Sequence, residues 1–259
     1  MNSLLRRSIL FSAETFYNIN EYELREIEKI EEDYLRKLVG TGKGCPISQL
    51  YLEVGQYPAR FDIFKMQILF YQYIICQDKT SLIYRFLQAQ KHSPVKGDWL
   101  SNVTNHMKII NLHLSEEELR RINKRKLKLI LNQKVNESAF QYLLSKRKSK
   151  GMEINYGQLQ MAQYLSPNDY KFTIKDKILM YSVRNRMTNN FHNFPNKQLS
   201  KQCQMGCQVI ESDYHNYICE KINDSKPDVK FTQIFNGHIS NQEKVLERIK
   251  INLERRENK

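Results

Sequence analysis

The stretch Pro58-Ala-Arg-Phe-Asp-Ile-Phe-Lys-Met-Gln-Ile-Leu-Phe-Tyr-Gln-Tyr-Ile-Ile-Cys76 decides the fold of this chain. Proline suits the first turn of a helix, and no glycine follows it in the run. Apolar residues recur at helical spacing and cover nearly every face, which is typical of a helix buried on all sides. Scattered polar residues keep the segment below membrane-spanning length. We therefore expect a core helix, with the rest of the chain packed around it.

Further helices are predicted on both sides of this segment. Asn20 and Glu23 have the spacing of a capping box, and apolar residues then recur up to Gly40, namely Leu24, Ile27, Ile30, Tyr34, Leu35 and Leu38. Later helices are expected over 46–54 and 99–110. Others are expected to start at Thr80, continuing through Ile83, Phe86 and Leu87, and at Ser115, with a bend near Asn132. The last two are expected to start at Thr173 and Asn241. Only nine Gly and six Pro occur in the whole chain, which agrees with a mainly α fold.

Composition limits the class of protein. The chain has 259 residues, of which 41% are hydrophobic, enough for a real core. Its net charge of +13 points toward a polyanionic partner, either nucleic acid or an anionic membrane. Nothing near Met1 has the pattern of a secretory signal, and most of the cysteines cluster at metal-binding spacing. We therefore expect an intracellular protein of the cytoplasm and nucleus, without a membrane partner.

A metal-binding motif lies near the C-terminal end. Cys203, Cys207, His215 and Cys219 follow the pattern Cys-x3-Cys-x7-His-x3-Cys. Zinc prefers a tetrahedron of thiolates and imidazole, and a Cys pair on a tight turn at Gly206 plus a His/Cys pair on a short helix would supply it. Four protein ligands leave no open position, so the expected cofactor is a structural zinc ion. The alternative is a chance grouping of three buried cysteines and a surface histidine.

A basic segment precedes this motif. Between Lys124 and Lys150, nine Lys or Arg residues stand against the single acid Glu137. Release of counterions from a phosphate backbone is the simplest use of such a face, although most charge runs are merely solvated helix faces. We expect nucleic-acid contacts from Lys124, Arg125, Lys126, Lys128, Lys134, Lys146, Arg147 and Lys148, and near the metal motif from Arg184, Arg186, Lys197 and Lys201.

Aromatic residues accompany the cations near the metal motif. They are Phe191, Phe194, Tyr214 and Tyr217. Exposed rings beside cations are suited to stacking on the bases of single strands. The alternative, which applies above all to Tyr214 and Tyr217 on either side of His215, is that the rings pack against the metal module itself.

No catalytic motif is found in the sequence. It contains no Asp-Asp pair, no P-loop, no Gly-x-Ser-x-Gly and no His-Glu-x-x-His, and its other histidines are scattered. We therefore expect no active site in this chain.

Several stretches, in their order along the chain, resemble the C-terminal part of non-LTR (LINE-type) retrotransposon reverse transcriptases, which follows the polymerase palm. The most specific is Tyr181-Ser-Val-Arg-Asn-Arg-Met187, an Asn-Phe loop and the Cys-Cys-His-Cys motif. The others are Arg7–Tyr17, Leu50–Gly55 with Ala59–Phe61, Ile83–Gln90 with Pro94–Trp99, Ile234-Phe235 and the closing helix to Arg256. The chain differs from the family in its Cys-x3-Cys pair, which is one residue longer than the commoner Cys-x2-Cys, and in lacking the fingers, the palm and its paired aspartates.

The resemblance implies the following organisation and function. Residues 1–114 would be a thumb-like helical region, 115–200 a basic helical linker, 201–222 the zinc knuckle, and 223–259 a linker with a terminal helix. Such a fragment of a reverse transcriptase, or decayed copy of one, would hold template RNA or target DNA without polymerizing. The alternative function is a helical protein-interaction or regulatory domain in which zinc is only a structural staple.

Overall fold

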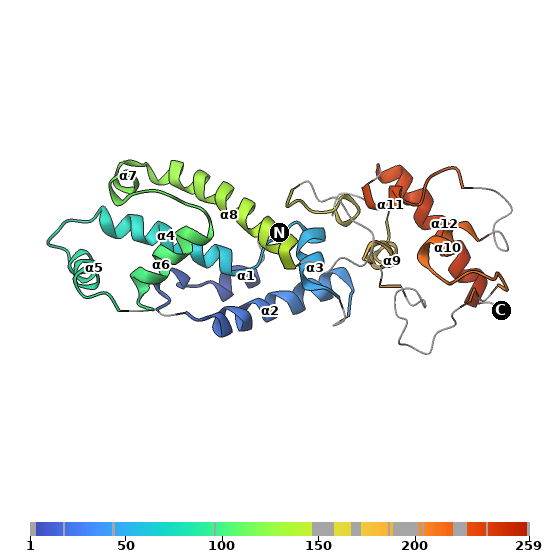
Figure 1. Cartoon of the computed structure of the whole chain (residues 1–259), viewed down its shortest axis with the longest axis horizontal. Coiled ribbons are helices and arrows are strands. Elements are labelled where there is room, and N and C mark those ends of the chain that lie inside the picture. The colour runs from blue at the N-terminus through green and yellow to red at the C-terminus, as the bar shows by residue number, and fades with distance from the viewer. Residues whose placement is uncertain are drawn as a thin grey trace. The chain divides into compact units, whose positions relative to one another are not determined.

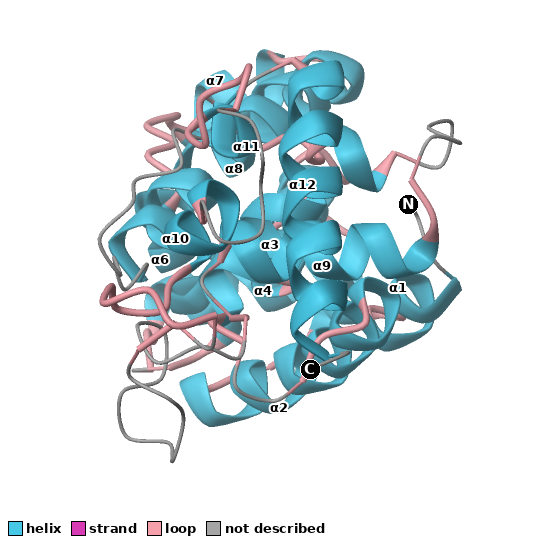
Figure 2. Ribbon diagram, turned by 90° about the vertical axis from the view of Figure 1, so that its right-hand side faces the viewer, coloured by secondary structure: helices cyan, strands magenta, loops and turns pink. Residues whose placement is uncertain are grey.

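The structure, a computed structural model, describes residues 4–17, 19–42, 45–95, 97–146, 158–166, 172–185, 187–188, 202–203, 205–219, 227–236 and 238–257. Within these ranges it contains twelve α-helices and two short 3-10 helices, and its β pairing there is limited to one antiparallel bridge between Gln202 and Ile210. Figure 2 shows helices throughout and no strand. The expected mainly α fold is confirmed. None of the described helices combines the length and the hydropathy that a membrane span requires.

The chain forms two compact units. The first unit consists of Met1–Leu35 and Gly55–Arg147, and the second of Arg36–Val54 and Lys148–Lys259. This division differs from the four regions expected from the sequence. The basic helix of the expected linker belongs to the first unit, and the metal motif shares the second unit with an early segment of the chain.

Helix α4 (Arg60–Ile75) is the centre of the first unit. It contacts the 3-10 helix η1 (Ala13–Thr15), α6 (Trp99–Ile109) and α8 (Lys124–Lys146). Figure 1 shows α6 and α8 alongside it. Phe61, Ile63 and Ile68 are at most 1% exposed. The sequence prediction of a core helix at this position is confirmed, because neighbours cover its apolar side chains on several sides.

Helix α2 (Glu21–Val39) has the predicted ends. The backbone N–H of Asn20 donates to the Glu23 carboxylate at 2.9 Å, and the N–H of Glu23 donates to Asn20 Oδ1 at 3.0 Å. At the other end Gly40 adopts a left-handed conformation, with φ 71°. The N–H groups of Gly40 and Thr41 return to the last carbonyl groups of the helix, which is the Schellman arrangement.

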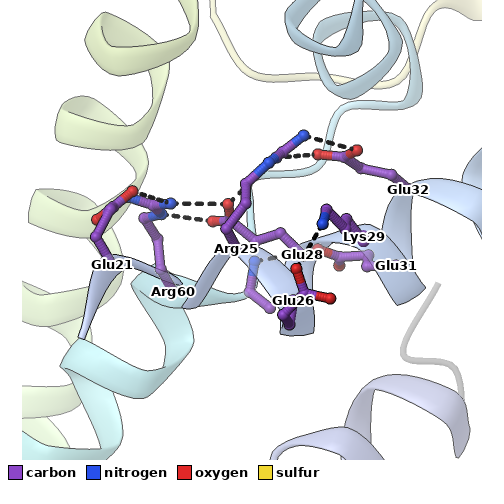
Figure 3. A network of polar contacts seen from close by, with 9 residues as sticks. Glu21, Arg25, Glu26, Glu28, Lys29, Glu31, Glu32 and Arg60 are labelled. Atoms are coloured by element: carbon purple, nitrogen blue, oxygen red, sulfur yellow. Dashed lines mark hydrogen bonds and ion pairs between the residues drawn. The ribbon is translucent and has the colours of Figure 1, made fainter. Parts of the chain in front are cut away.

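The residues of α2 that face inward are not all those that the apolar spacing predicts. Ile30 is 53% exposed, whereas Glu28 is only 1% exposed. Arg60 of α4 accounts for this, because its guanidinium donates to both Glu28 oxygens at 2.5 and 2.8 Å and also pairs with Glu21 (Figure 3). A buried carboxylate requires such a cation, and this one comes from another helix.

Two helix starts in the first unit also differ from expectation. Helix α5 (Leu82–His92) is capped by Ser81 instead of Thr80. The Thr80 hydroxyl donates to Asp78 at 2.6 Å. Phe86, predicted to be part of the inward pattern of this helix, is 61% exposed.

Helix α7 (Glu116–Arg121) starts with the predicted Ser115 capping box and then ends. Helix α8 begins anew at Lys124, where Asn123 Oδ1 accepts from the Arg125 N–H at 2.8 Å, and it passes Asn132 without interruption. The expected bend is therefore replaced by a break between two helices, for which Asn123 supplies the cap.

The second unit combines several short helices with the long helix α12. These are α3 (Ile47–Val54), α9 (Ile174–Arg184), α10 (Asp213–Ile218), α11 (Gln233–Asn236) and α12 (Ile239–Glu257). Helix α12 contacts α9, α10 and α11, and Figure 1 shows α10 and α11 beside it. Its start lies two residues before the predicted Asn241. Thr173 and Asp176 form a capping box at α9, where Thr173 was predicted as the cap.

Candidate metal centre and basic surface

The four predicted metal ligands come together in the second unit. The ligand atoms of Cys203, Cys207, His215 and Cys219 all lie within 4.8 Å of one another. Cys219 Sγ is 3.9 Å from Cys203 Sγ and 3.7 Å from Cys207 Sγ. A disulfide requires about 2.0 Å, whereas two thiolates on a tetrahedral zinc with bonds of about 2.3 Å lie about 3.8 Å apart. The spacing therefore fits a shared metal ion and not a covalent bridge.

A tight turn positions the first two ligands. The bridge between Gln202 and Ile210 closes the segment, and the Cys203 N–H donates to the Val209 carbonyl at 3.0 Å. Gly206 has φ 83°, a left-handed conformation that glycine adopts without steric cost. Within the turn, the backbone N–H of Met205 donates to Cys203 Sγ at 3.4 Å and helps to fix the position of that sulfur. The predicted role of Gly206 is confirmed.

A short helix positions the other two ligands. Ser212 caps α10, where its hydroxyl accepts from the His215 N–H at 3.0 Å. Residues four apart share one helix face, so His215 and Cys219 point the same way. Both are nearly buried, at 5% and 0% exposure, and Cys203 is 4% exposed. Cys207 is only partly buried. Three thiols and one imidazole are the soft ligand set that zinc prefers in tetrahedral sites closed to other ligands.

Helix α12 holds the end of α10. Arg248 Nε donates to the Tyr217 carbonyl at 2.9 Å, and the Asn252 side-chain amide donates to the Asn216 carbonyl. These are carbonyl groups of the last turn of α10, which have no partner within their own helix. Arg248 and Asn252 were not found by sequence reasoning, because a polar residue on a terminal helix carries no local signal of such a contact.

The two described aromatic residues of the motif differ in exposure. Tyr217 is 2% exposed, and its hydroxyl donates to the Val229 carbonyl, so it packs within the metal module. Tyr214 is 52% exposed and makes an edge contact with Phe231, with ring centroids 5.7 Å apart. Phe191 and Phe194 lie outside the described residues.

The basic surface is concentrated at the start of α8. Lys124, Arg125, Lys126 and Lys128 are exposed, and no acid lies in the first turn. Among the described residues these four cations form no ion pair. Cations at a helix N-terminus oppose the helix dipole by about 0.3–1 kcal/mol each. Helix stability therefore does not explain their presence.

The remaining predicted contacts of α8 are less available. Lys134 pairs with Glu137 at 3.6 Å, and Lys146 Nζ lies 5.8 Å from the centroid of the Tyr142 ring. Arg147 and Lys148 lie outside the described residues, as do Arg186, Lys197 and Lys201 near the metal motif.

Arg184 does not have the surface position expected for a nucleic-acid contact. It is 6% exposed, and its Nε pairs with Glu53 Oε1 at 2.9 Å. Its Nη1 donates to the Ile234 and Phe235 carbonyl groups at 2.6 Å, while the Tyr164 hydroxyl donates to the other Glu53 oxygen at 3.1 Å. The guanidinium thus connects α3, α9 and α11 within the second unit. Its buried position does not fit the nucleic-acid contact expected for Arg184.

The fold and the ligand geometry define a helical protein with a Cys3His group suited to a metal ion such as zinc. No protein-family model, curated protein or solved structure matches the chain.

Proposed function

We propose that this chain is a nucleic-acid-binding helical module with a structural zinc ion, and that it corresponds to the C-terminal part of a non-LTR retrotransposon reverse transcriptase. The assignment to that class of protein is supported by the sequence resemblance. The observation that carries nucleic-acid binding is the group of four exposed cations without acidic partners at the start of α8.

The metal has a structural role in this proposal. Cys203, Cys207, His215 and Cys219 would fill all four positions of a tetrahedral zinc ion and leave none for water or substrate. Zinc binding contributes on the order of 10 to 16 kcal/mol in small zinc-dependent modules. The ion would thereby fix the turn at 203–207 against α10 and stabilise the second unit.

The cations of α8 would contact the phosphate backbone. Such contacts release counterions, so affinity should fall steeply as salt rises and depend little on base sequence.

A charge-reversal experiment tests this function. We expect Lys126→Glu/Lys128→Glu to weaken binding of a labelled RNA or DNA oligonucleotide uniformly across sequences and to lower the salt slope by about 2. The matched control is Lys79→Glu/Lys108→Glu, which alters two other exposed cations of the first unit by the same charge. Equal losses in both variants, or binding that does not depend on salt, would contradict the proposal.

The same experiment distinguishes nucleic-acid binding from the alternative function. If the chain is a protein-interaction or regulatory domain with a zinc staple, the charge reversal in α8 should leave its activity unchanged while zinc remains necessary for folding.

A further inference from the structure

Helix α5 of the first unit has an exposed apolar stripe opposite the face that packs on the core. Leu82 is 83% exposed and Phe86 is 61% exposed, and Ala89 is exposed in the next turn. These residues occupy positions i, i+4 and i+7, which place them within about 60° of one another around the helix. Leu87 of the same helix is 1% exposed and fills the core.

The opposite side of α5 is fixed in place. Tyr84 Oη accepts a hydrogen bond from Arg120 Nη2 at 3.3 Å, and Lys91 pairs with Glu116 of α7. Helix α5 also contacts α4 and α6, and Figure 1 shows it at the far left of the view. The exposed stripe is therefore presented by an anchored helix and not by a free end. Leu82 and Phe86 lie one helical turn apart, so two large exposed apolar side chains are neighbours on this face.

Helix α5 itself carries positive charge and no acid, whereas the exposed acid Asp78 lies four residues before Leu82. Arg85 is exposed at one edge of the stripe and has no ion pair among the described residues, while the exposed Lys79 precedes the helix. The segment 79–95 contains no Asp or Glu. A complementary surface must therefore combine apolar side chains with carboxylates.

We propose that α5 is a docking site for an amphipathic helix of a partner protein that carries acidic side chains beside its apolar stripe. Apolar anchors at i, i+4 and i+7 are the usual pattern by which one helix recognises another surface, and a few well-placed anchors supply most of the affinity. Arg85 would pair with a carboxylate of the partner and set its orientation. This inference is independent of the proposed nucleic-acid binding.

Other occupants fit the stripe less well. A second copy of the chain in a two-fold contact would bring the same basic, acid-free helix opposite itself. Nucleic acid gains stacking from Phe86 but none from Leu82 or Ala89. A membrane surface rewards a large buried apolar area, which three side chains on one short helix do not supply.

A peptide titration against the full chain tests the proposal. The probe is a synthetic helical peptide of about 18 residues with Leu at i, i+4, i+7 and i+11 and Glu at the flanking positions. Its two controls are the same peptide with Lys for every Glu and a peptide of scrambled order. We expect the acidic peptide to bind roughly tenfold or more tightly than either control.

Variants of the chain assign that binding to α5. Leu82→Ser/Phe86→Ser should abolish it, and Arg85→Glu should reverse the preference between the acidic and basic peptides. Ile174→Ser is the matched control, because Ile174 is 79% exposed on α9 of the second unit. Unchanged fluorescence of the single Trp99, which lies in the first unit, verifies that the α5 variants are folded, and an unchanged circular dichroism spectrum verifies the same for Ile174→Ser.

Four results would overturn the proposal. They are equal binding of the acidic and basic peptides, an equal loss in Ile174→Ser, α5-dependent binding to phosphatidylserine vesicles without peptide binding, and self-association that Phe86→Ser abolishes.

Discussion

Arg248 on α12 donates from its Nε to the backbone carbonyl oxygen of Tyr217 at 2.9 Å. Tyr217 lies two residues from both His215 and Cys219, so this hydrogen bond ties the terminal helix to the half of the metal centre that α10 provides. The metal ligands thus depend on a residue that does not bind the metal.

From this relationship we predict that Arg248→Ala lowers zinc affinity without removing a ligand. Loss of a charged hydrogen bond to a buried carbonyl should cost about 1–3 kcal/mol, equivalent to roughly a tenfold to hundredfold weaker zinc affinity if the site and α12 are coupled. Competition with a chromophoric chelator measures the zinc affinity. Lys244→Ala, at an exposed position of the same helix, serves as the control. Identical zinc affinities for the two variants would show that α12 and the site are independent.

Gly40→Ala should destabilise the second unit. The residue has φ 71°, and an added Cβ would lie 2.5 Å from Ile178 Cδ1 of α9. Backbone strain and this overlap together should lower the free energy of unfolding by more than about 1 kcal/mol. Thermal unfolding followed by circular dichroism measures the effect. Gly42→Ala should have little effect, because nothing lies within 4 Å of its added Cβ. Equal destabilisation by both changes would contradict the role assigned to Gly40.

The stability of the first unit should fall in mild acid because of His106. This residue is buried against Phe64, with ring centroids 4.0 Å apart, and burial lowers the pKa of His106 to about 4. Its unfolded pKa is near 6.5, so between about pH 6.5 and pH 4 only the unfolded state takes up the proton. The free energy of unfolding should therefore decrease by up to about 3 kcal/mol across this window.

Denaturant titrations followed by Trp99 fluorescence test this pH dependence in the first unit alone. His106→Phe keeps the stacked ring and should remove the loss between pH 6.5 and pH 4. Partial burial opposes the shift at Glu116, yet hydrogen bonds from Lys91 and Arg120 lower the pKa of Glu116 to about 2. Stability from Glu116 is therefore lost only below about pH 4.5, and Glu116→Gln should leave the higher window unchanged. A slope between pH 6.5 and pH 4 that persists in His106→Phe would refute the assignment.

Arg184→Ala should weaken the fold of the second unit and not its contact with nucleic acid. Removing the guanidinium breaks the ion pair between Arg184 and the Glu53 carboxylate, which is 0% exposed. Breaking a buried pair in this way costs about 3–5 kcal/mol. Chemical denaturation gives the stability, and oligonucleotide binding is then measured on the folded fraction only. A large loss of affinity in fully folded Arg184→Ala would restore the surface role.

Features with local causes could be predicted from the sequence. The capping boxes at Asn20 and Ser115 depend on residues three positions apart, and Gly40 ends its helix through its own conformation. The metal group belongs to the same category, because its four ligands fall within seventeen residues and the turn at Gly206 brings the first pair together. Apolar content on nearly all faces was likewise sufficient to identify α4 as the core helix.

Features with distant causes could not be predicted. Glu28 faces inward toward Arg60 of another helix, which neutralises it together with Arg25 of its own helix. Arg184 is buried because Glu53, far away in the sequence, lies opposite it in the second unit. Phe86 belongs to the apolar residues of α5, yet its neighbour Leu87 packs on the core and Phe86 is left exposed. In these cases the contacts between different helices determine which side chains are buried, and the spacing of residues along one helix does not predict those contacts.

The zinc content of the purified full chain, measured by mass spectrometry with inductively coupled plasma, tests the central claim most directly. We predict one zinc ion per chain, its loss in Cys219→Ser and its retention in Cys76→Ser, which changes an exposed cysteine outside the ligand group. Removal of zinc by a chelator should also unfold the second unit while Trp99 fluorescence of the first unit stays unchanged. A chain that folds fully without zinc, or that keeps equal zinc in both variants, would contradict the account.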